Sequence, residues 1–151
     1  MYEHYLRQEA LAAFKKALSR GKKELFSLNP IKRRKKHILT LEMVLEHAGY
    51  GGESYIGIKE IPVRDIIGTE NRSNDYSKSF YPLKNWMQGN WSKIYELMTT
   101  DTIFEPVKLI EYGGYYFVRD GNHRISVAKF SNREYVSAEI VCFTLSFTLL
   151  R

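Results

Sequence analysis

Apolar residues recur at steps of three and four through residues 2–28, which is the period of an α-helix with one buried face. These positions are Tyr2, Leu6, Ala10, Ala13, Phe14, Ala17, Leu18, Leu25 and Leu28. A helix is therefore predicted over this range, with Gly21 as a point where it ends or is interrupted. After the breaker Asn29-Pro30, a second helix is expected from Thr40, an acceptable N-cap, to just before Gly49. The two helices would form a hairpin.

The pattern changes after Gly51-Gly52, where short apolar stretches of strand type alternate with short helical ones. Expected in order are a strand over 56–63, a polar loop over 68–78, a helix over 92–98, strands over 104–110 and 115–119, a helix over 124–130 and a strand over 134–143. Gly113-Gly114 predicts a tight antiparallel hairpin, because glycine supplies the positive φ that such turns require. We therefore expect an α+β core over residues 51–151, preceded by a helical extension over residues 1–50.

The charge is distributed unevenly along the chain. The net charge of the 151 residues is +6, and the first fifty residues hold 11 of the 23 Lys and Arg but only 5 of the 17 Asp and Glu. The core is therefore neutral overall, and the excess belongs to the extension. It is concentrated in a basic segment, Lys32, Arg33, Arg34, Lys35 and Lys36. Two interpretations stay open for this segment: a solvated surface, or a contact with nucleic-acid phosphates.

Composition excludes several classes of protein. No apolar run reaches the roughly 20 residues of a membrane-spanning helix, so no membrane partner is expected. Charged Glu3 and Arg7 stand where a secretory signal would need an apolar stretch. The single cysteine, Cys142, cannot form an internal disulfide. A cytoplasmic location is expected.

The candidate chemistry lies where the second hairpin strand meets the following helix. The sequence there is Asp120-Gly121-Asn122-His123-Arg124, and the apolar spacing beyond it is helical. The first amides of a helix have no partner within the helix and carry its positive dipole end. Glycine allows a ligand to approach the backbone closely, and an arginine fork can bind two phosphate oxygens. The pattern predicts a phosphate-sized anion pocket.

Asp120 complicates this prediction, because a carboxylate repels phosphate. The repulsion is removed if Asp120 holds Mg²⁺, pairs with Arg124 or His123, or accepts a proton from an attacking hydroxyl. The alternative is that Asp120 only caps the helix. Arg72 and Asp75, in the polar loop over 68–78, are expected to reach the pocket, unless that loop is only a surface excursion.

These residues resemble the signature of the ParB/sulfiredoxin superfamily. Sulfiredoxins carry Gly-Cys-His-Arg at the corresponding place, ParB partition proteins carry Gly-Glu-Arg-Arg or a close relative, and free serine kinases of this fold carry Asp-Gly-His-His-Arg. The resemblance covers roughly residues 56–143. It begins at Ile61-Pro62-Val63, which is similar to the family's opening strand, and extends to the strand after the motif. It implies a mixed sheet with short helices.

The resemblance also implies a ligand and site residues. The family binds ATP, ADP or CTP at this motif, so Gly121, Asn122, His123 and Arg124 would form the phosphate loop, with Mg²⁺ at Asp120. Glu60 corresponds loosely to a catalytic base of the serine kinase branch. Asn122 stands where sulfiredoxins keep their catalytic cysteine, so sulfiredoxin activity is not expected.

Two functions follow as hypotheses. The first is a nucleotide-binding module, regulatory or associated with DNA through the basic segment. The second is an Mg²⁺-dependent enzyme of the same fold, either a phosphotransferase that uses ATP or ADP or a nuclease. A retained fold without catalysis is a third interpretation.

Overall fold

The computed structural model describes all residues except 27–28, 30, 33–36, 73 and 147–151. Its centre is a six-stranded mixed sheet with the strand order β1-β3-β5-β4-β6-β2. The strands are β1 (Leu39–Thr40), β2 (Glu53–Pro62), β3 (Ile66–Thr69), β4 (Val107–Tyr112), β5 (Tyr115–Asp120) and β6 (Tyr135–Phe143). The β2–β6 and β4–β5 pairs are antiparallel, and the other pairs are parallel. The expected α+β class and mixed sheet are confirmed.

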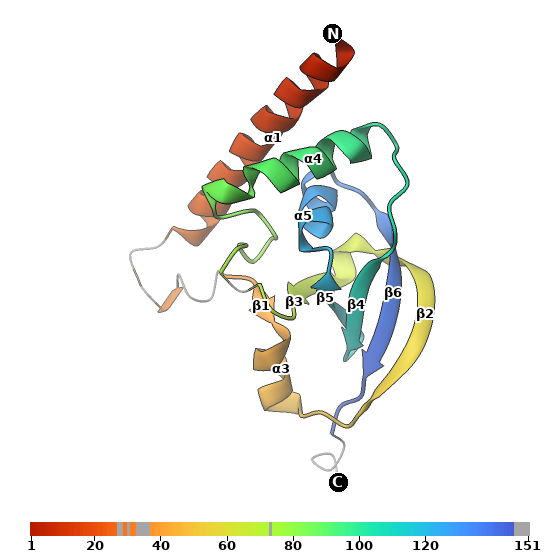
Figure 1. Ribbon diagram of the computed structural model, residues 1–151. Coiled ribbons are helices and arrows are strands. Elements are labelled where there is room, and N and C mark those ends of the chain that lie inside the picture. Colours follow the sequence, from red (N-terminus) through yellow and green to blue (C-terminus); the bar gives the residue numbers. More distant parts are fainter. Residues whose placement is uncertain (27–28, 30, 33–36, 73, 147–151) are drawn as a thin grey trace.

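Four α-helices and two 3-10 turns complete the described elements. They are α1 (Tyr2–Leu25), α3 (Leu41–Ala48), η1 (Val63–Asp65), η2 (Asn85–Met87), α4 (Gln88–Thr99) and α5 (Asn122–Phe130). In Figure 1, α1, α4 and α5 lie together at one end of the sheet, and α3 lies at the other end. No helix in the described part of the chain is long and apolar enough to span a membrane.

Helix α1 buries the stripe that its sequence predicts. Its seven buried residues follow helical spacing: Leu6, Ala10, Ala13, Phe14, Ala17, Leu18 and Gly21. Phe14 meets Trp91 of α4 edge to face, with 5.7 Å between the ring centroids. Gly21 neither ends nor interrupts the helix: a Cβ there would lie 2.7 Å from the Pro82 carbonyl oxygen, so glycine permits a close helix–loop contact. The helix ends at Leu25, earlier than expected.

The expected hairpin of the first two helices is wrong. Thr40 does cap α3, since its hydroxyl accepts from the Met43 amide at 3.4 Å, and Gly49 follows the helix. However, Leu39–Thr40 pairs with β3 as an edge strand, which the polar spacing did not indicate. Leu41 then packs with Ile110 and Phe143 in a cluster separate from the one that contains Phe14. The two helices therefore pack in different core clusters. The division at residues 50 and 51 stays a prediction, although residues on both sides share each cluster.

The elements around the motif follow the prediction closely. Gly113 and Gly114 have φ values of 61° and 85° and connect β4 to β5. Trp91 and Tyr95 stack on one face of α4, with centroids 5.9 Å apart. The segment over 68–78 is different from the expected polar loop at both ends, since Gly68 and Thr69 belong to β3 and Tyr76 is buried. That segment therefore packs into the body of the protein.

Candidate functional site

The turn from β5 into α5 requires glycine for two reasons. Gly121 has a φ of 107°, in the left-handed region that side chains disfavour. A Cβ at this position would lie 2.7 Å from Val107 Cγ1 and 3.1 Å from the Arg124 guanidinium. Asp120 makes no side-chain cap on α5, so the capping interpretation is wrong. The helix itself leaves its first amides without partners.

Asn122 anchors the start of α5. Its side chain is buried, and its Oδ1 accepts from Thr69 Oγ1 at 2.8 Å. Thr69 lies at the end of β3, the strand that pairs with β5. This hydrogen bond ties the start of α5 to the neighbouring strand, so Asn122 has a structural role besides its place in the predicted phosphate loop.

His123 faces the segment after β3. Its Nδ1 lies 3.0 Å from the Tyr76 hydroxyl, and the two rings meet edge to face. Burial raises the pKa of Tyr76, so the phenol stays protonated within hydrogen-bond distance of Nδ1. Burial also lowers the pKa of His123, Arg72 lowers it further, and Asp75 opposes both. The imidazole of His123 is therefore mostly neutral near neutral pH.

Arg72 lowers the pKa of His123 and Asp75 raises it, and whether either residue reaches the phosphate loop stays a prediction. The two form an ion pair with 3.1 Å between Arg72 Nη1 and Asp75 Oδ2. Half of the Arg72 side chain is exposed. Arg72 thus supplies a cationic group that acts on His123.

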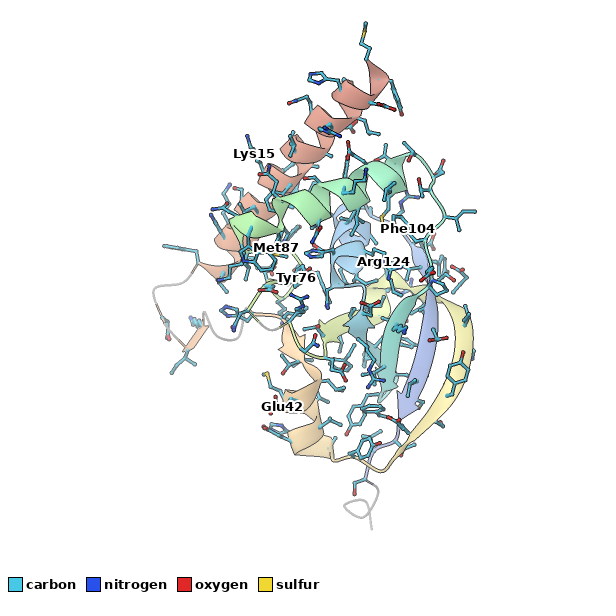
Figure 2. All side chains as sticks on the ribbon, viewed as in Figure 1. Lys15, Glu42, Tyr76, Met87, Phe104 and Arg124 are labelled. Carbon is cyan, nitrogen blue, oxygen red and sulfur yellow. The ribbon has the colours of Figure 1, made fainter. Side chains whose placement is uncertain are left out.

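Arg124 points to the other side of α5. Its Nη1 donates to the Glu105 carbonyl oxygen, and its guanidinium lies over the Phe104 ring at 6.0 Å. Its Nη2 is 3.8 Å from Asp120 Oδ2, and the Asp120 side chain is 70% exposed. Figure 2 shows Arg124 beside Phe104 and Tyr76 on the opposite side of the helix. The predicted pairing of Asp120 with Arg124 is present. The motif side chains His123 and Arg124 lie on two different faces of α5.

Arg124 lines a cavity of about 360 Å³, together with Glu60 from β2. The structure therefore brings together two predicted site residues that are far apart in sequence. Apolar walls come from residues such as Phe104 and Val136, and Arg133 adds a second guanidinium. Asp101 and Glu105 also contribute to the lining. Because the charges in the cavity are mixed, any anion affinity is local to Arg124 and the start of α5.

A Mg²⁺ site at Asp120 would have one protein carboxylate. Within the described residues, no three His, Cys, Asp or Glu side chains gather in an arrangement that could hold a metal. Mg²⁺ is commonly held by one or two carboxylates plus substrate phosphates and water, so an exposed Asp120 fits a metal that arrives with a nucleotide. Such a metal would neutralise charge between Asp120 and the phosphates.

The basic segment falls mostly outside the described residues. Lys32 is exposed, and Arg33, Arg34, Lys35 and Lys36 are not described. Any role of this segment remains a prediction.

Three supporting residues were missed by sequence reasoning: Thr69, Tyr76 and Phe104. Each contacts a motif side chain, but each comes from a distant segment. Arg119 was also missed; it forms a two-contact pair with Glu70, at 3.2 and 3.0 Å. The only feature of the sequence that pointed to this pair was the polar character of the segment that contains Glu70.

The sequence matches no protein-family model and no curated protein. Among solved structures, the chain is similar to sulfiredoxin from Arabidopsis thaliana, with 21% sequence identity and a TM-score of 0.42 over 58% of this chain and 86% of that chain. At this identity and TM-score the likeness carries no inference about family, reaction or ligand.

The His123–Tyr76 contact predicts a specific titration. His123 should titrate below 6.5, its ordinary pKa, with the neutral ring protonated at Nε2. We expect the Tyr76 hydroxyl to donate to Nδ1. Tyr76→Phe removes this donor, so the pKa of His123 should rise and both tautomers should appear. Nitrogen-15 NMR of the imidazole measures both quantities. Tyr112→Phe, which changes a tyrosine in the other core cluster, should leave His123 unchanged. An identical His123 titration in Tyr76→Phe would contradict the assignment.

Proposed function

We propose that the chain binds the phosphate groups of a nucleotide, ATP, ADP or CTP, at the start of α5 beside Arg124. The observation that carries the proposal is the position of Arg124 over the Gly121 turn: its guanidinium is 3.1 Å from where a Cβ would lie. A guanidinium and unpaired first-turn amides at the same turn form an anion site. The motif's resemblance to the ParB/sulfiredoxin superfamily supports the same ligand.

The adjoining cavity suits the rest of such a ligand. Its volume of about 360 Å³ lies within the range of small-molecule pockets, and Phe104 and Tyr135 offer aromatic surface. Phosphates beside Arg124 would place the sugar or base against this apolar wall. Arg124 now pairs with exposed Asp120 at 3.8 Å, a contact that solvent weakens and that phosphate or Mg²⁺ can replace.

Removal of Arg124 tests this site. Arg124→Ala should weaken nucleotide binding about 10- to 100-fold, because a charge-assisted hydrogen bond to phosphate contributes ~1.5–3 kcal/mol. Calorimetry with ATP, ADP, CTP and GTP, with and without Mg²⁺, measures the change. Arg7→Ala removes an exposed arginine of α1 that pairs with Glu96 at 3.8 Å, and serves as the matched control. Equal affinities in the two variants would exclude Arg124 from the site.

We further propose that the protein is a regulatory or DNA-associated module, in which the basic segment, residues 32–36, contacts nucleic-acid phosphates. The support is the position of the whole excess charge within the first fifty residues. Cations that contact phosphates release counterions, so binding of this kind depends steeply on salt.

Neutralising the basic segment tests this second contact. With all five residues changed to Gln, nucleic-acid affinity at low salt should fall, and the slope of affinity against salt should become shallower by up to about 0.9 per lost phosphate contact. Fluorescence anisotropy with a labelled duplex measures both quantities. Salt-independent binding, or no binding at low salt, would contradict the proposal.

A second candidate function is an enzyme of the same site, and one observation favours it: Glu60 lines the same cavity as Arg124. In a phosphotransferase, Glu60 would accept the proton of an acceptor hydroxyl as that oxygen bonds to phosphorus and the bond to the nucleoside diphosphate breaks. In a nuclease, water would take the place of the acceptor. Phosphoryl transfer depends mainly on positioning and charge neutralisation, which Arg124 and a metal at Asp120 would supply.

The two carboxylates distinguish an enzyme from a binding module. Asp120→Asn and Glu60→Gln should each abolish turnover of ATP or of a labelled oligonucleotide, while nucleotide affinity changes little. Glu139→Gln, in the β6 strand beside β2, is the control that should keep full turnover. A wild-type protein that binds nucleotide without turnover would favour the binding module, and an unchanged rate in Asp120→Asn would remove that residue from the mechanism.

A further inference from the structure

A second group of cationic side chains surrounds a groove that the sequence did not indicate. The groove has a volume of about 600 Å³ and lies between η1, the segment over 78–81 and the end of α5. Four cationic residues from these elements line it: Arg64, Lys78, Lys129 and Arg133. They are spread over a long stretch of the neutral core, so no basic run marks them.

Acidic side chains do not balance this group. No Asp or Glu is among the described residues that line the groove. At its margins, Asp65 lies 4.0 Å from Arg64 Nε, and Glu24 accepts hydrogen bonds from the amide and hydroxyl of Ser79. Even with both carboxylates counted, the four cations leave a local excess of positive charge. Such an excess, gathered in a concave surface, attracts anions.

Lys129 is the most informative member of the group. It is half-buried on α5, and its ammonium lies 5.5 Å from the centre of the Phe80 ring. Burial lowers its pKa, and Asp65 offsets this only in part. Among the described residues, no carboxylate lies within ion-pair distance of it. An ammonium that is partly removed from water without a partner is costly, and an arriving anion relieves that cost.

The other lining groups suit oxygen-rich anions. Ser79 and Asn132 add a hydroxyl and an amide. Arg133 uses one nitrogen, Nη2, to donate to the Met98 carbonyl oxygen at 2.8 Å, which holds its guanidinium in place. Arginine forks and lysines that approach from three segments match the several oxygens of a phosphate group.

We propose that this groove binds a ligand that carries at least two negative charges as phosphate groups, at a site that shares Arg133 with the cavity beside Arg124 and is otherwise distinct from it. The ligand is either a free oligophosphate or the phosphodiester chain of a nucleic acid, which present the same chemistry.

The experiment is an NMR titration of backbone amides with inorganic pyrophosphate at low salt. Amides over 78–81 and 129–132 should shift. The double variant Lys78→Gln/Lys129→Gln should weaken this response about tenfold, as expected for the loss of two partly exposed charge contacts. Lys59→Gln/Lys93→Gln, which removes two lysines outside the groove, is the charge-matched control and should retain wild-type affinity. Lys78→Gln alone, at an exposed position, should weaken binding without affecting the fold.

Additional measurements distinguish this site from the two binding sites proposed above. The shifts in the groove should persist in Arg124→Ala and in the variant neutralised at residues 32–36, even if both of those proposals fail. A single-stranded oligonucleotide that shifts the same amides identifies a phosphodiester chain as the ligand, and pyrophosphate binding alone identifies a free oligophosphate. No shift in the groove at millimolar pyrophosphate, or equal affinities in the two double variants, would overturn the proposal.

Discussion

The left-handed turn at Gly121 sets the positions of the motif side chains on α5. With a φ of 107° and no Cβ, the chain leaves β5 and enters α5 in contact with Val107 of the adjacent strand. The helix is then held by Asn122, whose side chain accepts from Thr69 on the other side of β5. A strand on each side of β5 therefore fixes the helix start, and the motif side chains take their directions from it.

The two partly buried side chains of the motif, His123 and Arg124, lie in separate environments. Buried Tyr76 contacts His123, whose pKa is lowered by burial, whereas Arg124 lies against Phe104 and Glu105 next to the cavity that contains Glu60. The start of α5 therefore carries a neutral imidazole on one face and a permanently charged guanidinium on the other. The phosphate site that we propose therefore rests on Arg124 and the helix amides, with His123 as a hydrogen-bond donor at its margin.

The N-terminal helix contributes to the core as well as to the charge of the molecule. Phe14 packs on Trp91, and Trp91 in turn donates from its indole nitrogen to Ser126 of α5 at 2.9 Å. A chain of contacts thus links α1 through α4 to the helix that carries the motif. The lysines of α1 stay on its exposed side, so one helix supports the site with its apolar face and keeps its charge in solvent.

The sequence by itself determined the local elements: the buried stripe of α1, the cap at Thr40, the Gly113-Gly114 hairpin and the turn before α5. Each depends on spacing or on the backbone freedom of glycine, which are local properties. Only the tertiary structure decided which residues meet. His123 and Arg124 are neighbours in sequence but about 100° apart around a helix, so they face different partners. Glu60 reaches the Arg124 cavity, Thr40 joins an edge strand, and four scattered cations line one groove, because sheet pairing brings distant segments together.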